Sequence, residues 1–213
     1  MSWANLWPFV TFALLGAYHG VNPGMGWLFA VARGLQEKQR SAVLRSLLPI
    51  ALGHEASIIS VVLVVGAAQA VVSPVLLRLT AALFLVCFAV YRLNRRMAHP
   101  RGFGMRVGPV RLAAWSFLMS SAHGAGLMLV PVVLGWRLAA SQEAVLPVGS
   151  LLAGRALIAG TVHTAAMLLV MGVVALVVYE KVGVGMLRKS WFNLDLAWTV
   201  ALLGAAAVTL ITA

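Results

Sequence analysis

Six long apolar blocks run through the chain and constrain its fold more than any other feature. They cover residues 6–32, 46–68, 73–91, 112–135, 148–178 and 192–212. A helix that crosses the hydrocarbon core of a bilayer needs about 20 apolar residues. Hydrophobic residues make up 62% of the sequence and charged residues 10%, whereas a soluble domain is about half apolar and a quarter charged. We therefore predict an all-α membrane protein with six transmembrane helices in a single domain, residues 1–213.

The basic residues predict how these helices are oriented. Of the 16 Lys and Arg residues, 13 lie in the connections that follow the first, third and fifth blocks. Cytoplasmic connections carry such an excess of basic residues, so both termini are expected outside and the protein in the plasma (inner) membrane. The net charge of +11 does not predict a nucleic-acid partner, because the basic residues form neither a single face nor an amphipathic helix.

The two halves of the chain, about 6–95 and about 110–212, share a pattern of histidines. Each half has a His-Gly pair in its first block, at His19 and His123, and a single histidine in its second, at His54 and His163. Because each half has three helices, the second half enters the membrane from the opposite side. Two inverted three-helix repeats, with both termini outside, are typical of transporters that bind substrate near the midplane. Chance similarity of the halves is the alternative.

The segment after His19 predicts a break inside the first block. His19 and Asn22 share a helix face, and Pro23-Gly24 follow directly. Proline removes a helix hydrogen bond, and lipid tolerates such a break only where protein or a water-filled cavity satisfies the freed backbone groups. A break here would release carbonyl oxygens and redirect Met25, as in an ion site. A plain kink is the alternative.

The other three histidines also have potential metal ligands beside them. Met119 and Met167 lie four residues, about one helical turn, from His123 and His163, and Glu55 directly follows His54. Imidazole suits nickel, cobalt, copper and zinc, and thioether sulfur favours copper(I). Ionisable groups are costly inside a membrane and so mark functional sites. The predicted midplane site consists of His19, Asn22, Met25, His54, Glu55, Met119, His123, His163 and Met167. Packing of the methionines, and a hydrogen bond from the Glu55 carboxyl group to a neighbouring helix, are the alternatives.

Residues 19–25, His-Gly-Val-Asn-Pro-Gly-Met, resemble a motif of the nickel/cobalt transporters in the lysine-exporter (LysE) superfamily, particularly its NicO-like branch. That motif has the form His-x-x-x-Pro-Gly-His, and Met25 stands at its second histidine. His54 matches a histidine on the family's second helix, so the specific resemblance covers about residues 16–57. It implies a three-plus-three helix plan and a carrier of a metal ion or small solute.

The favoured hypothesis is a transporter, not an enzyme, whose substrate is a nickel, cobalt, copper or zinc ion moved by alternating access. Only neutral imidazole binds metal, so binding is expected to weaken as the pH falls through about 6.5. One alternative is a proton-coupled exporter of a small organic solute, with Glu55 and the histidines as the relay. Another is a membrane protein that binds haem through paired histidines. Beyond the lipid bilayer, the sequence leaves assembly into a homo-oligomer open.

Overall fold

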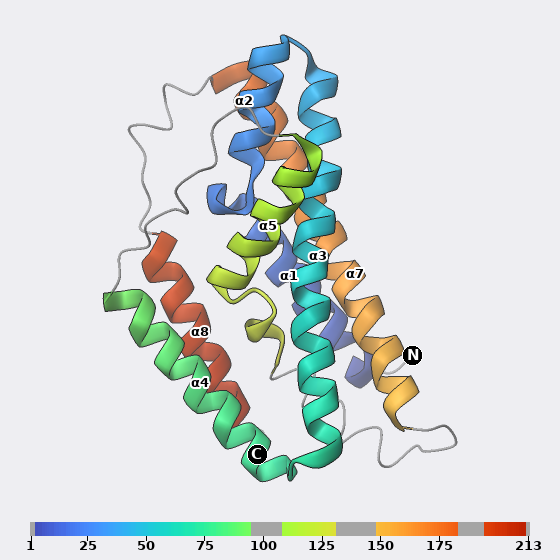
Figure 1. Ribbon diagram of the computed structural model, residues 1–213, viewed down its shortest axis with the longest axis vertical. Coiled ribbons are helices and arrows are strands. Elements are labelled where there is room, and N and C mark those ends of the chain that lie inside the picture. The colour runs from blue at the N-terminus through green and yellow to red at the C-terminus, as the bar shows by residue number, and fades with distance from the viewer. Residues whose placement is uncertain (1–2, 95–107, 131–147, 183–193, 212–213) are drawn as a thin grey trace. The chain divides into compact units, whose positions relative to one another are not determined.

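The computed structural model describes residues 3–94, 108–130, 148–182 and 194–211, and this part of the chain is helical with no strand. The α-helices are α1 (Trp3–Val21), α2 (Trp27–Glu37), α3 (Arg40–Val71), α4 (Pro74–Asn94), α5 (Pro109–His123), α7 (Val148–Val177) and α8 (Leu194–Ile211) (Figure 1). Two short 3-10 turns, η1 (Pro23–Met25) and η2 (Leu127–Leu129), follow α1 and α5, and the π-helical turn η3 (Val178–Val182) extends α7. The all-α prediction is confirmed.

Two of these helices are long and apolar enough to cross a membrane. They are the segment Arg40–Ala68 of α3 and the segment Leu157–Lys181, which runs from α7 into η3. Shorter apolar stretches lie in α1, α4 and α8. Large apolar side chains such as Val64 and Leu169 are about 70% exposed, and a lipid environment would cover them. Much of the basic sequence behind the predicted orientation, in 95–107 and 183–193, lies outside the described residues.

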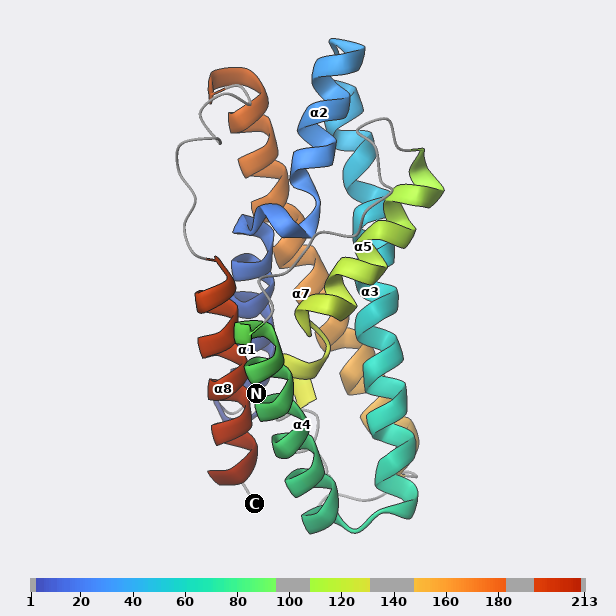
Figure 2. The ribbon, with the colours of Figure 1, turned by 60° about the vertical axis from the view of Figure 1, so that its left-hand side comes forward.

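The fold consists of two compact units, and each takes segments from both halves of the sequence. The first contains the described parts of Met1–Ser57, Pro100–Ala122 and Ala159–Phe192, and the second those of Ile58–His99, His123–Ile158 and Asn193–Ala213. Within the second unit, α4 and α8 run side by side (Figures 1 and 2), and η2 contacts α8. Every predicted ligand except His123 belongs to the first unit.

The break expected in the first apolar block separates α1 from α2. The Asn22 side-chain oxygen accepts a hydrogen bond from the Gly24 backbone N–H at 2.8 Å and so caps η1. Pro23 then occupies the first position of η1, where no backbone N–H is needed. Gly26 follows with φ of +117°, a conformation that favours glycine, and α2 starts at Trp27. The segment Asn22–Gly26 thus ends α1 at Val21, one residue after the His-Gly pair.

Helices α1 and α7 approach each other closely through two glycines. A Cβ atom added to Gly16 would lie 2.9 Å from the carbonyl carbon of His163, and one added to Gly20 would lie 2.5 Å from the carbonyl oxygen of Met167. Glycines four residues apart share a helix face, and such faces let membrane helices pack backbone to backbone. We refer to α1 and α7 as the α1–α7 pair.

Helices α3 and α5 form a second close pair. A Cβ atom on Gly53 would lie 2.9 Å from the carbonyl carbon of Ala113. The Ser116 hydroxyl donates a 2.7 Å hydrogen bond to the Ile50 carbonyl oxygen, and such interhelical hydrogen bonds add to packing in membranes. We refer to α3 and α5 as the α3–α5 pair. The candidate site lies where His54 of this pair meets the α1–α7 pair.

Candidate metal centre

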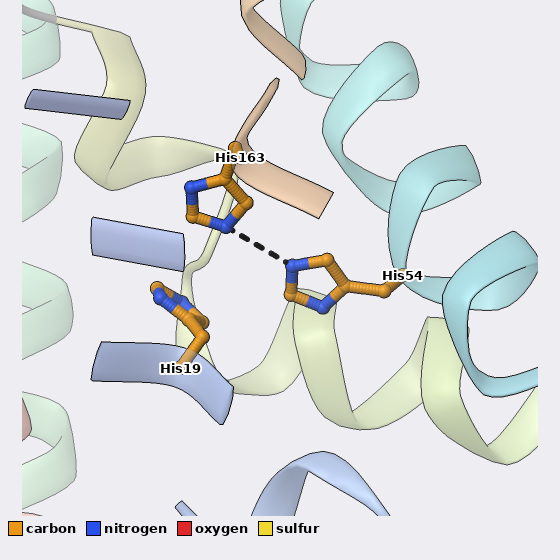
Figure 3. A group of neighbouring side chains, drawn as sticks. All are labelled: His19, His54 and His163. Atoms are coloured by element: carbon orange, nitrogen blue, oxygen red, sulfur yellow. Dashed lines mark hydrogen bonds between the residues drawn. The ribbon is translucent and has the colours of Figure 1, made fainter. Parts of the chain in front are cut away.

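Three imidazoles from three different helices meet inside the first unit (Figure 3). They belong to His19 of α1, His54 of α3 and His163 of α7, and one ring nitrogen from each lies within 4.8 Å of the other two. The ring centroids are 4.9 to 5.4 Å apart, and all three residues are at most 1% exposed. Residues far apart in the sequence therefore present metal-ligating atoms to one buried point. We call these three residues the imidazole cluster.

His163 is held by the backbone of α1. Its Nδ1 atom lies 3.1 Å from the carbonyl oxygen of Phe12, and a carbonyl oxygen only accepts, so Nδ1 carries the hydrogen. In the neutral ring, Nε2 then carries the lone pair. The Phe12 ring also contacts the imidazole edge to face. A backbone carbonyl that receives the second N–H of a histidine is the usual arrangement around a metal ligand.

His19 has the same tautomer for the same reason. Its Nδ1 atom donates to the carbonyl oxygen of Leu15 over 2.7 Å, one turn back along α1. Its Nε2 atom therefore carries the lone pair in the neutral ring. Two members of the imidazole cluster are thus set to bind an ion through Nε2.

The Nε2 atoms of His54 and His163 face each other at 3.3 Å (dashed line in Figure 3). Because His163 Nε2 has the lone pair, His54 Nε2–H is the donor when no ion is bound. A tetrahedral ion with metal–nitrogen bonds of about 2.0–2.1 Å separates two ligand nitrogens by about 3.3–3.4 Å. The observed spacing of this pair fits an ion between the two Nε2 atoms, with the His54 proton moved to Nδ1 so that the ring stays neutral.

Glu55 and Thr164 directly follow His54 and His163 and form a second contact between α3 and α7. The Thr164 hydroxyl donates a hydrogen bond to the Glu55 carboxyl group. The alternative for Glu55 was a carboxyl kept neutral and hydrogen-bonded to a neighbouring helix; the contact with α7 is present, and the carboxyl accepts in it. Its oxygens are not among the ligand atoms of the imidazole cluster.

Asn22 and the three predicted methionine ligands are all buried, but they lie on different structural elements. The Asn22 side-chain oxygen is bonded to the Gly24 N–H, and its Nδ2 atom has no hydrogen-bond partner among the described residues. The structure places Met25 in η1, Met119 in α5 and Met167 one turn beyond His163, each at most 2% exposed. Such positions also suit methionine as a packing residue. The oxygen expected from Asn22 is therefore engaged by the backbone break itself.

His123 is not part of the imidazole cluster. It is the last residue of α5 and is 6% exposed, but it belongs to the second compact unit. The next residue, Gly124, has φ of +73°, so the helix ends at this histidine. Of the four expected histidines, the three in the first unit are thus brought together, and the place of His123 in the site stays a prediction.

The features that sequence analysis missed are backbone groups and glycines. The carbonyl groups of Phe12 and Leu15 orient two of the rings, and no side-chain pattern reveals them. The four-residue spacing of Gly16 and Gly20 around His19 is a signal that could have indicated close packing of α1. The glycines bring the α7 backbone near enough for the Phe12–His163 hydrogen bond.

No protein-family model, curated protein or solved structure matches the chain. Fold and site together define a class: a helical protein with two helices able to cross a membrane and a buried group of three histidines with the spacing of metal ligands. Function is therefore inferred from the chemistry of this site.

Proposed function

We propose that the protein is a multi-pass membrane transporter whose substrate is a transition-metal ion, bound by His19, His54 and His163. The observation that carries this proposal is the convergence of three buried ligand nitrogens from three helices within 4.8 Å. Placing three ionisable imidazoles together in an apolar interior is costly, and such groups inside a membrane therefore mark functional sites. Two of them also have the tautomer that leaves Nε2 available to an ion.

The proposed topology is six transmembrane helices in two inverted repeats. Three parallels between the halves support it. In each half, the helix that carries the single histidine is long and apolar enough to span a membrane: α3 with His54, and α7 with His163. The first helix of each half, α1 and α5, ends at or near its His-Gly pair and is followed by a 3-10 turn. In such folds a substrate site at the meeting of the repeats opens to either side in turn.

The resemblance of residues 16–57 to NicO-like transporters supports the same function. His19 and His54 are the positions that match the family's histidines, and both belong to the imidazole cluster. His163 comes from the second half of the chain, at the position that corresponds to His54 in the first. The proposed ion would thus be held by ligands from both repeats.

The spacing of His54 and His163 weighs against haem bound between them. Two imidazoles on opposite sides of a haem iron are separated by twice a metal–nitrogen bond, about 4 Å, with the macrocycle between them. The observed 3.3 Å between Nε2 atoms is shorter. The haem alternative would require the two rings to move apart.

Ion uptake into proteoliposomes tests the proposal. Nickel, cobalt, zinc and copper(I) are offered to the wild type, to His19→Ala and to His123→Ala, the matched control in which a buried histidine outside the imidazole cluster is removed. We expect saturable flux of at least one ion, lost in His19→Ala and kept in His123→Ala. Absence of flux for all four ions, or full flux in His19→Ala, would refute metal transport and favour an organic-solute carrier.

A further inference from the structure

We infer that the imidazole cluster selects a monovalent d¹⁰ cation, copper(I) or its analogue silver(I), over divalent nickel, cobalt and zinc. This inference rests on the proposed function and names the class of ion. It follows from the charge and burial of the ligand set, the number of ligands and a neighbouring thioether.

The ligand set is electrically neutral. The Nδ1–H groups of His19 and His163 are donated to backbone carbonyls, so each ring binds an ion as neutral imidazole. Among the described residues, no carboxylate shares the group of ligand atoms, and the nearby Glu55 carboxyl is bonded to Thr164. The direct ligands therefore contribute no negative charge to offset that of a bound ion.

The site is also buried, so this remaining charge is expensive. The three residues are at most 1% exposed. The cost of transferring an ion from water to a medium of low dielectric constant grows with the square of its charge, so a dication costs about four times as much as a monocation of equal size. Three neutral ligands offset that cost far better for a single charge than for a double one.

The number of ligands points the same way. The Asn22 amide oxygen, the expected fourth donor, already accepts a hydrogen bond from Gly24. Copper(I) and silver(I) bind readily with two or three ligands, whereas zinc in a three-histidine site takes a fourth ligand such as water, and nickel and cobalt often take more.

Met167 supplies a soft group on the same face. It lies four residues beyond His163 on α7 and is fully buried, and residues at this spacing are neighbours on a helix. Thioether sulfur favours copper(I) over the harder divalent ions. Met167 thus adds a soft group beside the three imidazoles.

Equilibrium binding to the purified full-length protein in detergent tests the inference. The probes are silver(I) and zinc, with copper(I) kept reduced by ascorbate, and calorimetry reads the affinity and the number of ions per chain. We expect one silver(I) or copper(I) ion per chain, bound at least 100-fold more tightly than zinc, with this binding lost in His19→Ala and kept in His123→Ala.

An isosteric pair of variants isolates the role of charge. His54→Glu replaces a neutral ligand with an anionic one, and His54→Gln removes the ligand without adding charge. We expect the ratio of silver(I) to zinc affinity to fall at least tenfold further in His54→Glu than in His54→Gln, with size-exclusion elution confirming that both variants fold. If either variant fails to fold, the wild-type affinities decide.

The outcomes separate the two proposals. Zinc or nickel bound as tightly as silver(I), and lost in His19→Ala, would overturn the selectivity and leave metal transport standing. Equal affinity ratios in the Glu and Gln variants would overturn the charge argument. A folded wild type that binds none of these ions would overturn both.

Discussion

Replacing Gly16 with alanine tests whether the close packing of α1 and α7 sets the geometry of the imidazole cluster. The new Cβ atom would lie 2.9 Å from the carbonyl carbon of His163 and closer still to its oxygen. Ordinary contacts between such atoms are about 3.5–4.0 Å, so the two backbones must separate by roughly 1 Å. His163 belongs to the backbone that would move.

The expected loss of affinity follows from this displacement. Metal–ligand distances tolerate errors of about 0.2 Å, and the Phe12–His163 hydrogen bond of 3.1 Å would lengthen beyond its useful range. Disturbing such an outer partner of a metal-ligating histidine costs about 10- to 100-fold in metal affinity. The extra volume should also lower the free energy of unfolding by about 1–3 kcal/mol.

Gly66→Ala is the matched control, because a Cβ atom at Gly66 of α3 meets nothing within 4 Å. Alanine is favoured over glycine inside a helix by about 1 kcal/mol, so this control should be as stable as the wild type or more so. Calorimetric titration with silver(I) and with zinc, together with thermal unfolding, measures both effects. Wild-type metal affinity in a folded Gly16→Ala protein would refute the packing argument.

Three further predictions concern the backbone break, ion selectivity and a surface ion pair. Asn22→Ala removes the cap of η1 and should lower the free energy of unfolding by about 1 kcal/mol, measured by thermal unfolding; an unchanged stability would contradict the capping role. Met25→His restores the second histidine of the resembling motif and should raise nickel or cobalt flux relative to copper(I) in proteoliposomes, whereas an organic-solute carrier would show no metal-specific response. Arg40→Ala breaks the exposed ion pair with Glu180 at 3.3 Å and should change the unfolding free energy by less than about 1 kcal/mol; a larger loss would assign that pair a structural role.

The helical content and the break after α1 could be predicted from sequence because their causes are local. An apolar block of sufficient length predicts a helix, and Asn22-Pro23-Gly24 carries both the cap and the residue that interrupts hydrogen bonding. The candidate site was predicted in part for a similar reason. Histidines inside apolar blocks stand out, and three of the four meet.

The remaining parts of the site depend on contacts that sequence patterns do not specify. His123 was expected beside the other histidines because the halves share a pattern; it is the last residue of α5 and belongs to the second unit. The Asn22 oxygen was expected as a ligand, yet it is used by the turn that the same residues create. Choice of helix partners, as between Gly16 and His163, depends on the tertiary fold.

The wide separation of the histidines along the chain has a consequence for biosynthesis. His163 follows His54 by 109 residues, so at 5–20 residues per second the ribosome needs roughly 5–20 s to deliver the third ligand. An ion cannot assist insertion of α1 and α3, since its site does not yet exist. During that interval His19 can already donate its N–H to Leu15 within its own helix, whereas His163 finds its carbonyl partner on a helix made much earlier. Binding of the proposed ion would therefore be a late event, after α7 has joined a helix that was already in place.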